Sequence, residues 1–507
     1  MFLDDALTLN ASEWSDDDAV VGFDVRHTFA SFNDRVDRIA AGLQSLGLVA
    51  GDRLSILADN HPDYLATHFA CARTGVILHV LNVRLTAGEM AYAVNDAASQ
   101  ILFVDDPYTT DPLLADLLTQ TPSIHQIVAM REPGEHCTDS LEAVISHSDV
   151  LTSVERQVTD PVILIYTSGT TGRPKGALQN HRGSLMADQL MTEAGLFNRQ
   201  DVWLASMPFF HQAGLIRSRA MIGVGALNVI LGRLSPEQVA DAVRVHGVTV
   251  AMLVGGQLRS ILDENPEGSS LRLLIGGGGA GERGVASLTR SCEQLGCTAI
   301  GVYGQTETHG TITVVDLKTA QRNPATCGYP GKGVSLRIID DEGNRMSHSE
   351  TGEIQVHGSM TGSYWNNDQA NADLYSADGW LHTGDLGYLD EGGWLHLRGR
   401  KKELIKTGAE NVYPREVEVV LLNHPGISDA AVIGLSDREW DEAVVAILVA
   451  SNDQPPSLDD IREFCRRHIA GYKLPRRGEW VDELPRNHTG KIQTGLLRQR
   501  YRAEVSN

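Results

Sequence analysis

An uninterrupted apolar run of about 18 residues, the length that a helix needs to cross a membrane, is missing from this sequence of 507 residues. The N-terminus also lacks the basic and apolar segments of a secretory signal, because Asp4 and Asp5 stand there. From these absences we expect a cytoplasmic protein with no transmembrane segment.

Cysteine and positive charge are both in short supply. The six cysteines are scattered, with no Cys-x-x-Cys pair and no Cys/His spacing of a zinc site. We therefore expect reduced thiols and no structural zinc. The formal net charge of −22 disfavours a general nucleic-acid binder. A polyanionic ligand must then be bound by local cations.

What the sequence does contain is an alternation of helical and strand patterns. Apolar residues at spacings of four, three, four and three predict an amphipathic helix from Phe32 to Leu46, with Gly47 as its C-cap. Another helix is expected over residues 62–73, and short apolar strands over 53–58, 76–81, 101–105 and 162–165. This alternation predicts α/β layers with a mainly parallel sheet, in a chain too long for one domain. Such sheets bind ligands at the carboxyl ends of their strands.

The most informative stretch is residues 166–176, which follow the strand at 162–165 and are rich in Ser, Thr and Gly. Backbone N–H groups, hydroxyls and the Lys175 ammonium could surround phosphate oxygens there. It is not a Walker A loop, because Arg173 and Pro174 separate Gly172 from Lys175. A flexible surface loop is the alternative, but eleven ordered positions after a strand favour a phosphate site.

Two later strands end in residues suited to a nucleotide. The strand at 273–279 ends in four glycines, whose open backbone a planar base could approach. The strand at 299–302 runs into Tyr303, Thr306 and Glu307, which could stack a base, hold a phosphate and coordinate Mg²⁺. Taken alone, residues 303–307 are better explained by a turn than by a site. A buried core histidine explains His211 equally well.

These segments, together with residues 383–385 and 398–418, resemble the acyl-adenylate-forming superfamily of acyl-CoA synthetases, adenylation domains and luciferases. The resemblance extends from about Thr28 to Arg498, with the motifs in the family's order. The sequence is identified as a member of the AMP-forming carboxylate–CoA ligase branch. That resemblance implies a large N-terminal domain of layered α/β subdomains over residues 1–400. It also implies a small mobile α+β C-terminal domain over residues 401–507, with the hinge near Lys402.

The resemblance also assigns roles to residues of the large domain. Thr306 would contact the α-phosphate of ATP, and Glu307 would bind Mg²⁺. Asp385 and Arg400 would hold the ribose, since a carboxylate offers paired acceptors. The adenine would lie between Tyr303 and a glycine segment made of Gly277, Gly278 and Gly279. The β- and γ-phosphates would be held by Thr167, Ser168, Gly169, Thr170, Thr171, Gly172 and Lys175.

In the small domain, the resemblance implies that Lys491 reaches the bond forming between the acid and the α-phosphate. The catalytic set would be Lys491, Thr306, Glu307 and His211. Lys402 is the hinge position, and Gly408 belongs to the segment that moves into the site for the thiol step. The family more often has Gly where Ala409 stands, and the added methyl group would narrow the pantetheine passage.

Coenzyme A is the expected acceptor, because the sequence carries no carrier-protein domain. Trp440 stands where some relatives stack the CoA adenine, although Asp441 replaces the usual Gly after it. Cations for a CoA phosphate are expected from Arg466, Arg467, Lys473, Arg476 and Arg477. The oligomeric state stays open, with a homodimer as one alternative.

The acid substrate is expected to be an aryl, alicyclic or fatty acid. Relatives that activate amino acids carry an Asp after the aromatic residue in the segment that corresponds to residues 208–214. Here His211 follows Phe210 instead, and His211 would line the pocket near the substrate carboxylate. Ala251, Gly255 and Gly256 suggest a roomy apolar pocket. Three alternatives remain: a luciferase-like oxygenase, an enzyme that loads a carrier protein, and a non-catalytic ATP-binding regulator. Lys491, Glu307 and Asp385 together argue against the regulator.

Overall fold

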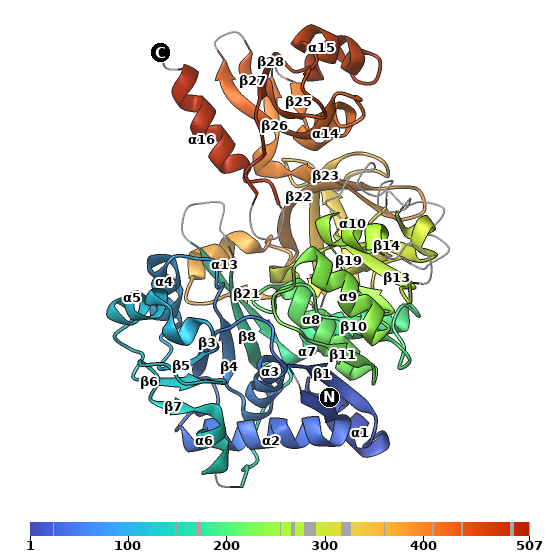
Figure 1. Ribbon diagram of the computed structural model, residues 1–507. Helices are drawn as coiled ribbons and strands as arrows, with labels where there is room; N and C mark the ends of the chain where they lie inside the picture. Colours follow the sequence, from blue (N-terminus) through green and yellow to red (C-terminus); the bar gives the residue numbers. More distant parts are fainter. Residues whose placement is uncertain are drawn as a thin grey trace.

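The structure is a computed structural model of mixed α/β architecture, with a large N-terminal region and a smaller C-terminal domain at one end of the molecule (Figure 1). It describes residues 1–23, 25–147, 150–167, 174–253, 255–264, 269–277, 291–315, 326–358, 360–407, 410–437, 440–486 and 491–505. The predicted α/β class is confirmed. Ser168, Gly169, Thr170, Thr171, Gly172, Gly278, Gly279, Gly408 and Ala409 lie outside the described residues.

The first large sheet has eight strands in the order β21-β9-β8-β4-β3-β5-β6-β7. Its strands are β3 (Arg53–Leu57), β4 (Ile77–Val80), β5 (Ile101–Val104), β6 (Gln126–Ala129), β7 (Asp139–Ser140), β8 (Pro161–Thr167), β9 (Lys175–Asn180) and β21 (Ser363–Tyr364). The pairs among β3 to β8 are parallel, as predicted. Strands β9 and β21 extend the sheet with antiparallel pairs. The expected phosphate loop thus joins β8 to β9.

Helices α2 (Phe29–Ser45), α3 (Pro62–Thr74), α4 (Ala87–Ala97), α5 (Pro112–Gln120) and α6 (Leu141–Ser146), with a 3-10 turn at Tyr108–Thr110, complete this part. In α2 the predicted stripe Phe32, Val36, Ile39 and Leu43 is buried. Thr28 caps its N-terminus, and Gly47 follows its end at φ 83°, a conformation that favours glycine. No helix of the described residues is both long and apolar enough to cross a membrane.

A second sheet of seven strands has the order β14-β13-β12-β10-β11-β1-β2, parallel except at β2. Its strands are β1 (Asp18–Gly22), β2 (Val25–Thr28), β10 (Val202–Leu204), β11 (Leu227–Val229), β12 (Val250–Ala251), β13 (Leu273–Gly277) and β14 (Thr298–Val302). The accompanying helices are α1 (Asp5–Glu13), α7 (His181–Glu193), α8 (Gln212–Gly223), α9 (Pro236–His246) and α10 (Gly255–Glu264). Helix α8 is buried along almost its whole length.

A four-stranded antiparallel sheet, β19-β20-β22-β23, lies next to the C-terminal domain (Figure 1). It consists of β19 (Val334–Ile339), β20 (Gly352–Gly358), β22 (Leu381–Leu389) and β23 (Leu395–Arg400), with α13 (Asp368–Leu374) before β22. Two short antiparallel pairs precede it: β15 (Gly304–Gln305) with β16 (Gly310–Thr311), and β17 (Thr313–Val314) with β18 (Tyr329–Pro330). A 3-10 turn, η2 (Thr306–Thr308), connects β15 to β16.

The C-terminal domain is a sheet in the order β25-β24-β27-β26, with β28 also paired to β27. Its elements are η3 (Lys401–Glu403), β24 (Ile405–Thr407), β25 (Glu410–Val412), α14 (Pro414–Leu421), β26 (Ile427–Asp437), β27 (Asp441–Ala450), α15 (Leu458–Arg466), η4 (Gly471–Lys473), β28 (Arg477–Trp480) and α16 (Thr494–Val505). Ile405, Val417, Val432 and Val444 belong to a core cluster of its own. This part therefore has a hydrophobic core of its own, while its mobility and the hinge near Lys402 stay predictions.

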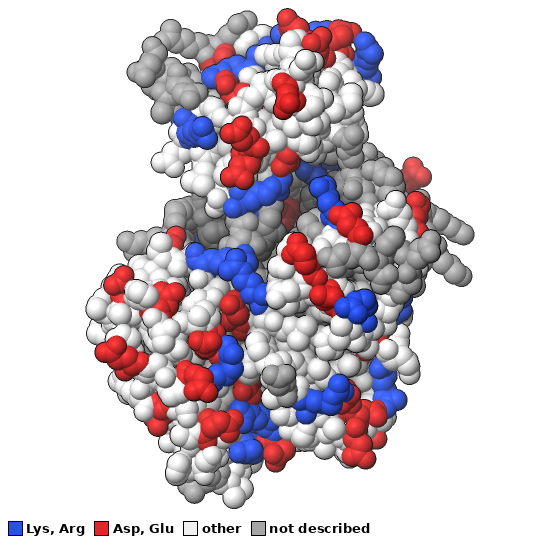
Figure 2. Space-filling view, viewed as in Figure 1, with Lys and Arg blue, Asp and Glu red and all other residues white. Residues whose placement is uncertain are grey.

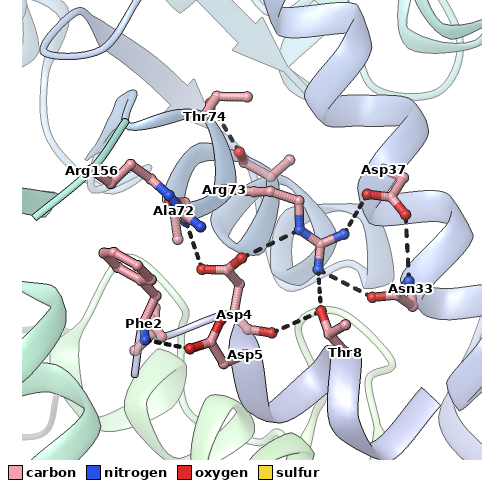
Figure 3. A network of polar contacts seen from close by, with 12 residues as sticks. Phe2, Asp4, Asp5, Thr8, Asn33, Asp37, Ala72, Arg73, Thr74 and Arg156 are labelled. Atoms are coloured by element: carbon pink, nitrogen blue, oxygen red, sulfur yellow. Dashed lines mark hydrogen bonds and ion pairs between the residues drawn. The ribbon is translucent and has the colours of Figure 1, made fainter. Parts of the chain in front are cut away.

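The N-terminal segment is fixed to the large region by a buried carboxylate (Figure 3). Asp4 accepts from Arg156 at 2.8 Å and from Arg73 at 3.4 Å, and Arg73 also binds Asp37 of α2 at 2.6 Å. The side chain of Arg156 lies over the ring of Phe2. This network joins α1, α2 and α3 on the side of the molecule away from the C-terminal domain (Figure 1).

Candidate active site

A buried carboxylate on β22 brings three predicted nucleotide residues together. The Tyr303 hydroxyl donates to Asp385 Oδ2 at 2.9 Å, and Arg400 Nε lies 2.8 Å from Asp385 Oδ1. Asp385 and Arg400 are direct partners in the β22–β23 ladder, so the antiparallel register aligns them. Gly277 ends β13 beside Val302, one residue before Tyr303. The sequence patterns that predicted an adenine and ribose site thus converge on one spot.

Burial shifts the pKa values of both Asp385 and Tyr303. Burial raises the pKa of Asp385, while Arg400 and the hydrogen bond from Tyr303 oppose that rise. Burial also raises the pKa of Tyr303 well above its usual value, and the Asp385 charge adds to this. Tyr303 is therefore a hydrogen-bond donor at neutral pH, and Asp385 is held as an acceptor between two donors.

The predicted Mg²⁺ ligand Glu307 lies at the carboxyl end of β8. Its Oε1 accepts from the Tyr364 hydroxyl at 2.9 Å and from Thr167 Oγ1 at 3.3 Å. Lys175 Nζ lies 5.0 Å from the centre of the Tyr364 ring. The structure thus gathers Thr167, Lys175 and Glu307 around Tyr364. No group of three or more His, Cys, Asp or Glu side chains suited to a metal occurs in the part of the chain described.

Sequence reasoning missed Tyr364. Its strand β21 is only two residues long, and pairing with β9 across almost two hundred positions brings it to Glu307. Burial raises the pKa of Tyr364, and Glu307 raises it further, so its hydroxyl is a donor. No local pattern around residue 364 signals this contact.

Two glutamines, also missed from the sequence, hold the turn that carries Glu307. Gln179 Nε2 donates to the Thr306 carbonyl and to Gln212 Oε1, both at 2.8 Å. Gln212 Nε2 in turn donates to the His309 carbonyl at 2.9 Å. The main chain of Thr306, predicted to contact the α-phosphate, is thereby tied to β9 and to the first residue of α8.

His309 closes the turn from its other end. Its Nε2 accepts from the Asn180 N–H at 3.0 Å, and its Nδ1 donates to the Met360 carbonyl at 3.1 Å. The residue adopts φ 57° and is fully buried. Burial lowers the pKa of His309 to about 4. A neutral ring with both nitrogens bonded therefore pins the end of η2 to β9.

His211 precedes α8, on a loop clamped by one buried asparagine. Asn60 Nδ2 donates to the carbonyls of Ala205 and Met207 at 2.8 Å, and its Oδ1 accepts from the Phe209 N–H at 2.7 Å. The His211 ring centre lies 4.8 Å from that of Phe210. His211 is thus the immediate neighbour of Gln212, which contacts the turn of Thr306 and Glu307.

Lys491 approaches this site from the C-terminal domain. Although the residue as a whole is exposed, burial lowers the pKa of its ammonium, and the nearby Arg400 lowers it further. Glu403 and Asp385 oppose this shift. Burial and the nearby Arg400 also lower the pKa of Lys402. Figure 2 shows a hollow between the two parts of the molecule, with Lys and Arg side chains on both of its sides.

The predicted CoA contacts form a smaller feature of the C-terminal domain. The Arg476 guanidinium lies 3.7 Å from the centre of the Trp440 ring. Lys473 pairs with Glu416 at 2.7 Å, and Arg466 and Arg477 have carboxylate partners as well. Arg467 lies 3.9 Å from Glu463. The stacked Trp440–Arg476 pair is therefore the part of this predicted set that offers an aromatic face beside a cation.

The residues predicted to bind the nucleotide thus lie close to one another in the large region, and Lys491 of the smaller domain is near them, as expected for an adenylate-forming enzyme. The chain belongs to the AMP-binding enzyme family: the model of the AMP-binding enzyme matches residues 7–365, and that of the AMP-binding enzyme C-terminal domain matches residues 416–491. The recognition made from the sequence motifs is confirmed.

Curated relatives match along nearly the whole chain. Fatty acid–[acyl-carrier-protein] ligase ScoC of Streptomyces coeruleorubidus is 34% identical, over 94% of this chain and 91% of its own. Indoleacetate–CoA ligase of Aromatoleum aromaticum is 32% identical, over 97% and 98%. A 2-succinylbenzoate–CoA ligase of Bacillus licheniformis is 32% identical, over 94% and 96%.

Solved structures of relatives also match this structure along nearly the whole chain. ATP-bound MatB from Rhodopseudomonas palustris covers 99% of both chains at 27% identity, with a TM-score of 0.88. Apo MatB from the same source, with the same coverage and identity, gives a TM-score of 0.79. The O-succinylbenzoate coenzyme A synthetase MenE from Bacillus subtilis, in complex with ATP and magnesium ion, covers 98% of both chains at 30% identity, with a TM-score of 0.83.

Proposed function

We propose that the protein is an AMP-forming carboxylate–CoA ligase, an acid–thiol ligase that uses ATP. In the first half-reaction a carboxylate oxygen attacks the α-phosphorus of ATP, giving an acyl-adenylate and pyrophosphate. In the second, the CoA sulfur attacks the acyl carbon, the bond to AMP breaks, and the thiol proton is released. The observation that carries this proposal is the group formed by Tyr303, Asp385 and Arg400, in which Asp385 is close enough to Glu307 and Lys491 for both charges to affect its pKa.

The first step faces electrostatic repulsion, because a carboxylate approaches a phosphate. Lys491, entering from the C-terminal domain, would stabilise charge on the reacting oxygens. Lys175 would do the same for the departing pyrophosphate. Mg²⁺, when bound, supplies charge neutralisation between the phosphates, and one carboxylate such as Glu307 together with phosphate oxygens suits this ion. Positioning by Asp385 and Arg400 would contribute the rest.

The acceptor in the second step is proposed to be CoA, as the names of two relatives support. Trp440 with Arg476 would offer a stacking face and a cation to the CoA nucleotide. A carrier protein is the second candidate, favoured by the relative named as an acyl-carrier-protein ligase. Both acceptors present the same thiol, so the chemistry is shared and only the docking surface differs. A cytoplasmic location, where ATP and CoA are both supplied, is part of the proposal.

The acid is proposed to be an aryl, alicyclic or fatty acid. Ala251 ends β12 in the second sheet, and the names of the relatives include aromatic and fatty acids. His211, next to the turn of Thr306, would lie near the carboxylate that is activated.

The test is pyrophosphate release with Mg-ATP across aryl, alicyclic and fatty acids, each with and without CoA. We expect release that depends on an acid and steady turnover that depends on CoA. Release that ignores CoA but needs a carrier protein would favour the second candidate. Activation of acetate or propionate alone would contradict the proposed acid class, and no release with any acid would contradict the ligase itself.

A further inference from the structure

Two cysteines meet where a helical segment ends beside the second sheet. Residues 291–295 are helical, and β14 begins directly after Cys297. The Cys297 N–H donates to the Cys292 carbonyl at 2.9 Å. The Gly296 N–H donates to the Glu293 carbonyl at 3.3 Å, and Gly296 has φ 68°. These hydrogen bonds and the left-handed glycine form a Schellman motif, which brings the side chains of its first and sixth residues together.

In this motif the side-chain contact is made by two thiols. The Cys292 S–H donates to the Cys297 sulfur, and both cysteines are free. The backbone hydrogen bond between the same two residues, with standard bond lengths, keeps their Cα atoms within about 7 Å, the upper limit for a disulfide. Cys292 belongs to a hydrophobic core cluster, and Cys297 packs against that cluster. The fold therefore holds the two sulfur atoms where they can be joined.

Cys297 is the better nucleophile of the pair. It is half-buried, whereas Cys292 is buried. The hydrogen bond from Cys292 lowers the pKa of the Cys297 thiol, and the same contact, together with burial, raises the pKa of Cys292. The thiolate is the form that reacts with oxidants. Cys297 would therefore react first, with Cys292 beside it as the second thiol.

The other four cysteines, all within the described residues, are placed differently. Burial raises the pKa of Cys71, that of Cys327 to about 12 and that of Cys465 to about 11. Cys137 is half-buried, but it packs against a different hydrophobic cluster, to which no other described cysteine belongs. Oxidation to an intrachain disulfide is therefore expected at the Cys292–Cys297 pair.

We propose that Cys292 and Cys297 are a modification site, at which a peroxide oxidises the two thiols to a reversible disulfide. The Cys297 thiolate attacks one oxygen of hydrogen peroxide, the O–O bond breaks, and the products are a sulfenic acid and hydroxide, which takes up a proton. The Cys292 sulfur then attacks the Cys297 sulfur, the S–O bond breaks, and the oxygen leaves as water with the Cys292 proton. Two thiols are oxidised to one disulfide, and one peroxide is reduced to two waters.

The second thiol would stop oxidation at a reversible stage. A sulfenic acid without a neighbouring thiol is oxidised further to a sulfinic acid, which simple thiols do not reduce. Cys292 would prevent this at the entry to β14, the strand that pairs with β13 and leads to Tyr303 (Figure 1). The site would thus protect a strand that ends at the predicted nucleotide site.

The test treats the full-length protein with a small molar excess of hydrogen peroxide and then blocks the remaining thiols. The number of free thiols per chain should fall by two from six, and dithiothreitol should restore all six. Both cysteines lie in one tryptic peptide, residues 291–318, which should lose two hydrogen atoms. Further cleavage after Glu293 should leave two fragments that only the disulfide holds together.

Cys292→Ala removes the second thiol and keeps Cys297. After the same treatment Cys297 should become a sulfinic acid, and the fraction of Cys297 thiol that dithiothreitol restores should fall at least about tenfold. Cys137→Ala is the matched control, because it removes a half-buried cysteine outside the pair, and it should leave the disulfide yield unchanged. Thermal unfolding of each variant shows whether it has folded.

The wild-type protein alone can overturn this inference. If it keeps all six free thiols, forms a disulfide between other cysteines, or converts Cys297 to a sulfinic acid despite Cys292, the pair is not the proposed site. Full recovery of Cys297 by dithiothreitol in Cys292→Ala would also contradict the role of Cys292. None of these measurements uses an acid, ATP or CoA, so a failure of the proposed function would leave this result unaffected.

Discussion

At the scale of single residues, the site depends on one carboxylate that is shared by two donors. Asp385 accepts from Tyr303 and from Arg400, and the donors come from different parts of the large region. Each oxygen has one protein partner, so lone pairs remain for the hydroxyls of a ribose. Because Arg400 also lowers the pKa of Lys491, the predicted nucleotide site and the C-terminal domain share one electrostatic environment.

Lys491 gives the first prediction. Lys491→Ala should reduce acid-dependent pyrophosphate release by about a hundredfold or more, because it removes charge stabilisation from the first transition state. The same variant should keep much of its acyl-CoA formation from preformed acyl-adenylate, since that step expels AMP without joining two anions. The measurement is single-turnover kinetics of both half-reactions. Equal losses in both would contradict a role confined to the first.

Some of these residues could be predicted and others could not. Tyr303, Glu307, Asp385 and Lys491 stand in motifs whose residue types and order indicate their chemistry. Gln179 and Tyr364 act through contacts between residues more than 50 positions apart, so no local pattern signals them.

At the scale of elements, the turn η2 is the part that needs support. It is three residues long, and a turn so short has little stability of its own. The ring of His309 binds β9 and the Met360 carbonyl, while Gln179 binds the Thr306 carbonyl. Helix α7 approaches the same ring at Gly183, where a Cβ would lie 2.6 Å from ring atoms of His309.

Gly183→Ala should therefore displace His309 and the turn with it. We expect an activity loss of about tenfold or more and a free energy of unfolding lower by about 1–3 kcal/mol. Gly223→Ala is the matched control, because Gly223 also lies in a helix and a methyl group there meets nothing within 4 Å. It should leave activity unchanged. If Gly183→Ala also behaved like this control, close packing against His309 would not position the turn.

The buried histidine also predicts a pH dependence of stability. The pKa of His309 is about 4 in the folded protein, against about 6.5 when the chain is unfolded. The unfolded chain binds the extra proton between these values, so stability is complete above pH 6.5 and declines toward pH 4. This group alone should lower the free energy of unfolding by about 2 kcal/mol at pH 5.

Urea unfolding of the wild type and of His309→Gln at pH 8 and pH 5 measures this effect. The variant should be less stable at pH 8 and should lose less on acidification. His79 and His181, whose pKa values burial lowers to about 3 and about 4, keep part of the acid sensitivity in both proteins. An identical pH dependence of the two proteins would show that His309 does not titrate in this range.

Elements with a clear period were predictable, and elements formed by distant pairing were not. The helix predicted from Phe32 to Leu46 is α2, and the strand at 101–105 is β5, each shifted by only a few residues. The two-residue strands β15, β16 and β21 are too short to have a period. They exist because tertiary pairing satisfies their backbone groups, and two of them flank Glu307.

At the scale of the whole molecule, the structure is more similar to ATP-bound MatB than to apo MatB. The TM-score is 0.88 against ATP-bound MatB and 0.79 against apo MatB, at the same identity and coverage. The charge of Lys491 acts on the Asp385–Arg400 pair in this arrangement. We interpret it as the arrangement for the first half-reaction.

The proposed second arrangement requires rotation near Lys402, in the 3-10 turn η3 that precedes β24. Lys402→Pro should restrict backbone rotation there and reduce thioester formation about tenfold more than adenylation. Lys402→Ala removes the side chain without this restriction and is the control. The two half-reactions are measured separately, and equal effects of Lys402→Pro on both would show that the hinge lies elsewhere.

The central claim is that the acid is activated as an acyl-adenylate, and oxygen transfer tests it most directly. The substrate acid is labelled with ¹⁸O in its carboxylate and turned over with Mg-ATP and CoA, and the nucleotide product is analysed by mass spectrometry. Because the attacking oxygen stays with phosphorus when sulfur displaces AMP, we expect AMP that carries one ¹⁸O per turnover and pyrophosphate that carries none. Unlabelled AMP, or ADP with labelled phosphate, would contradict the account.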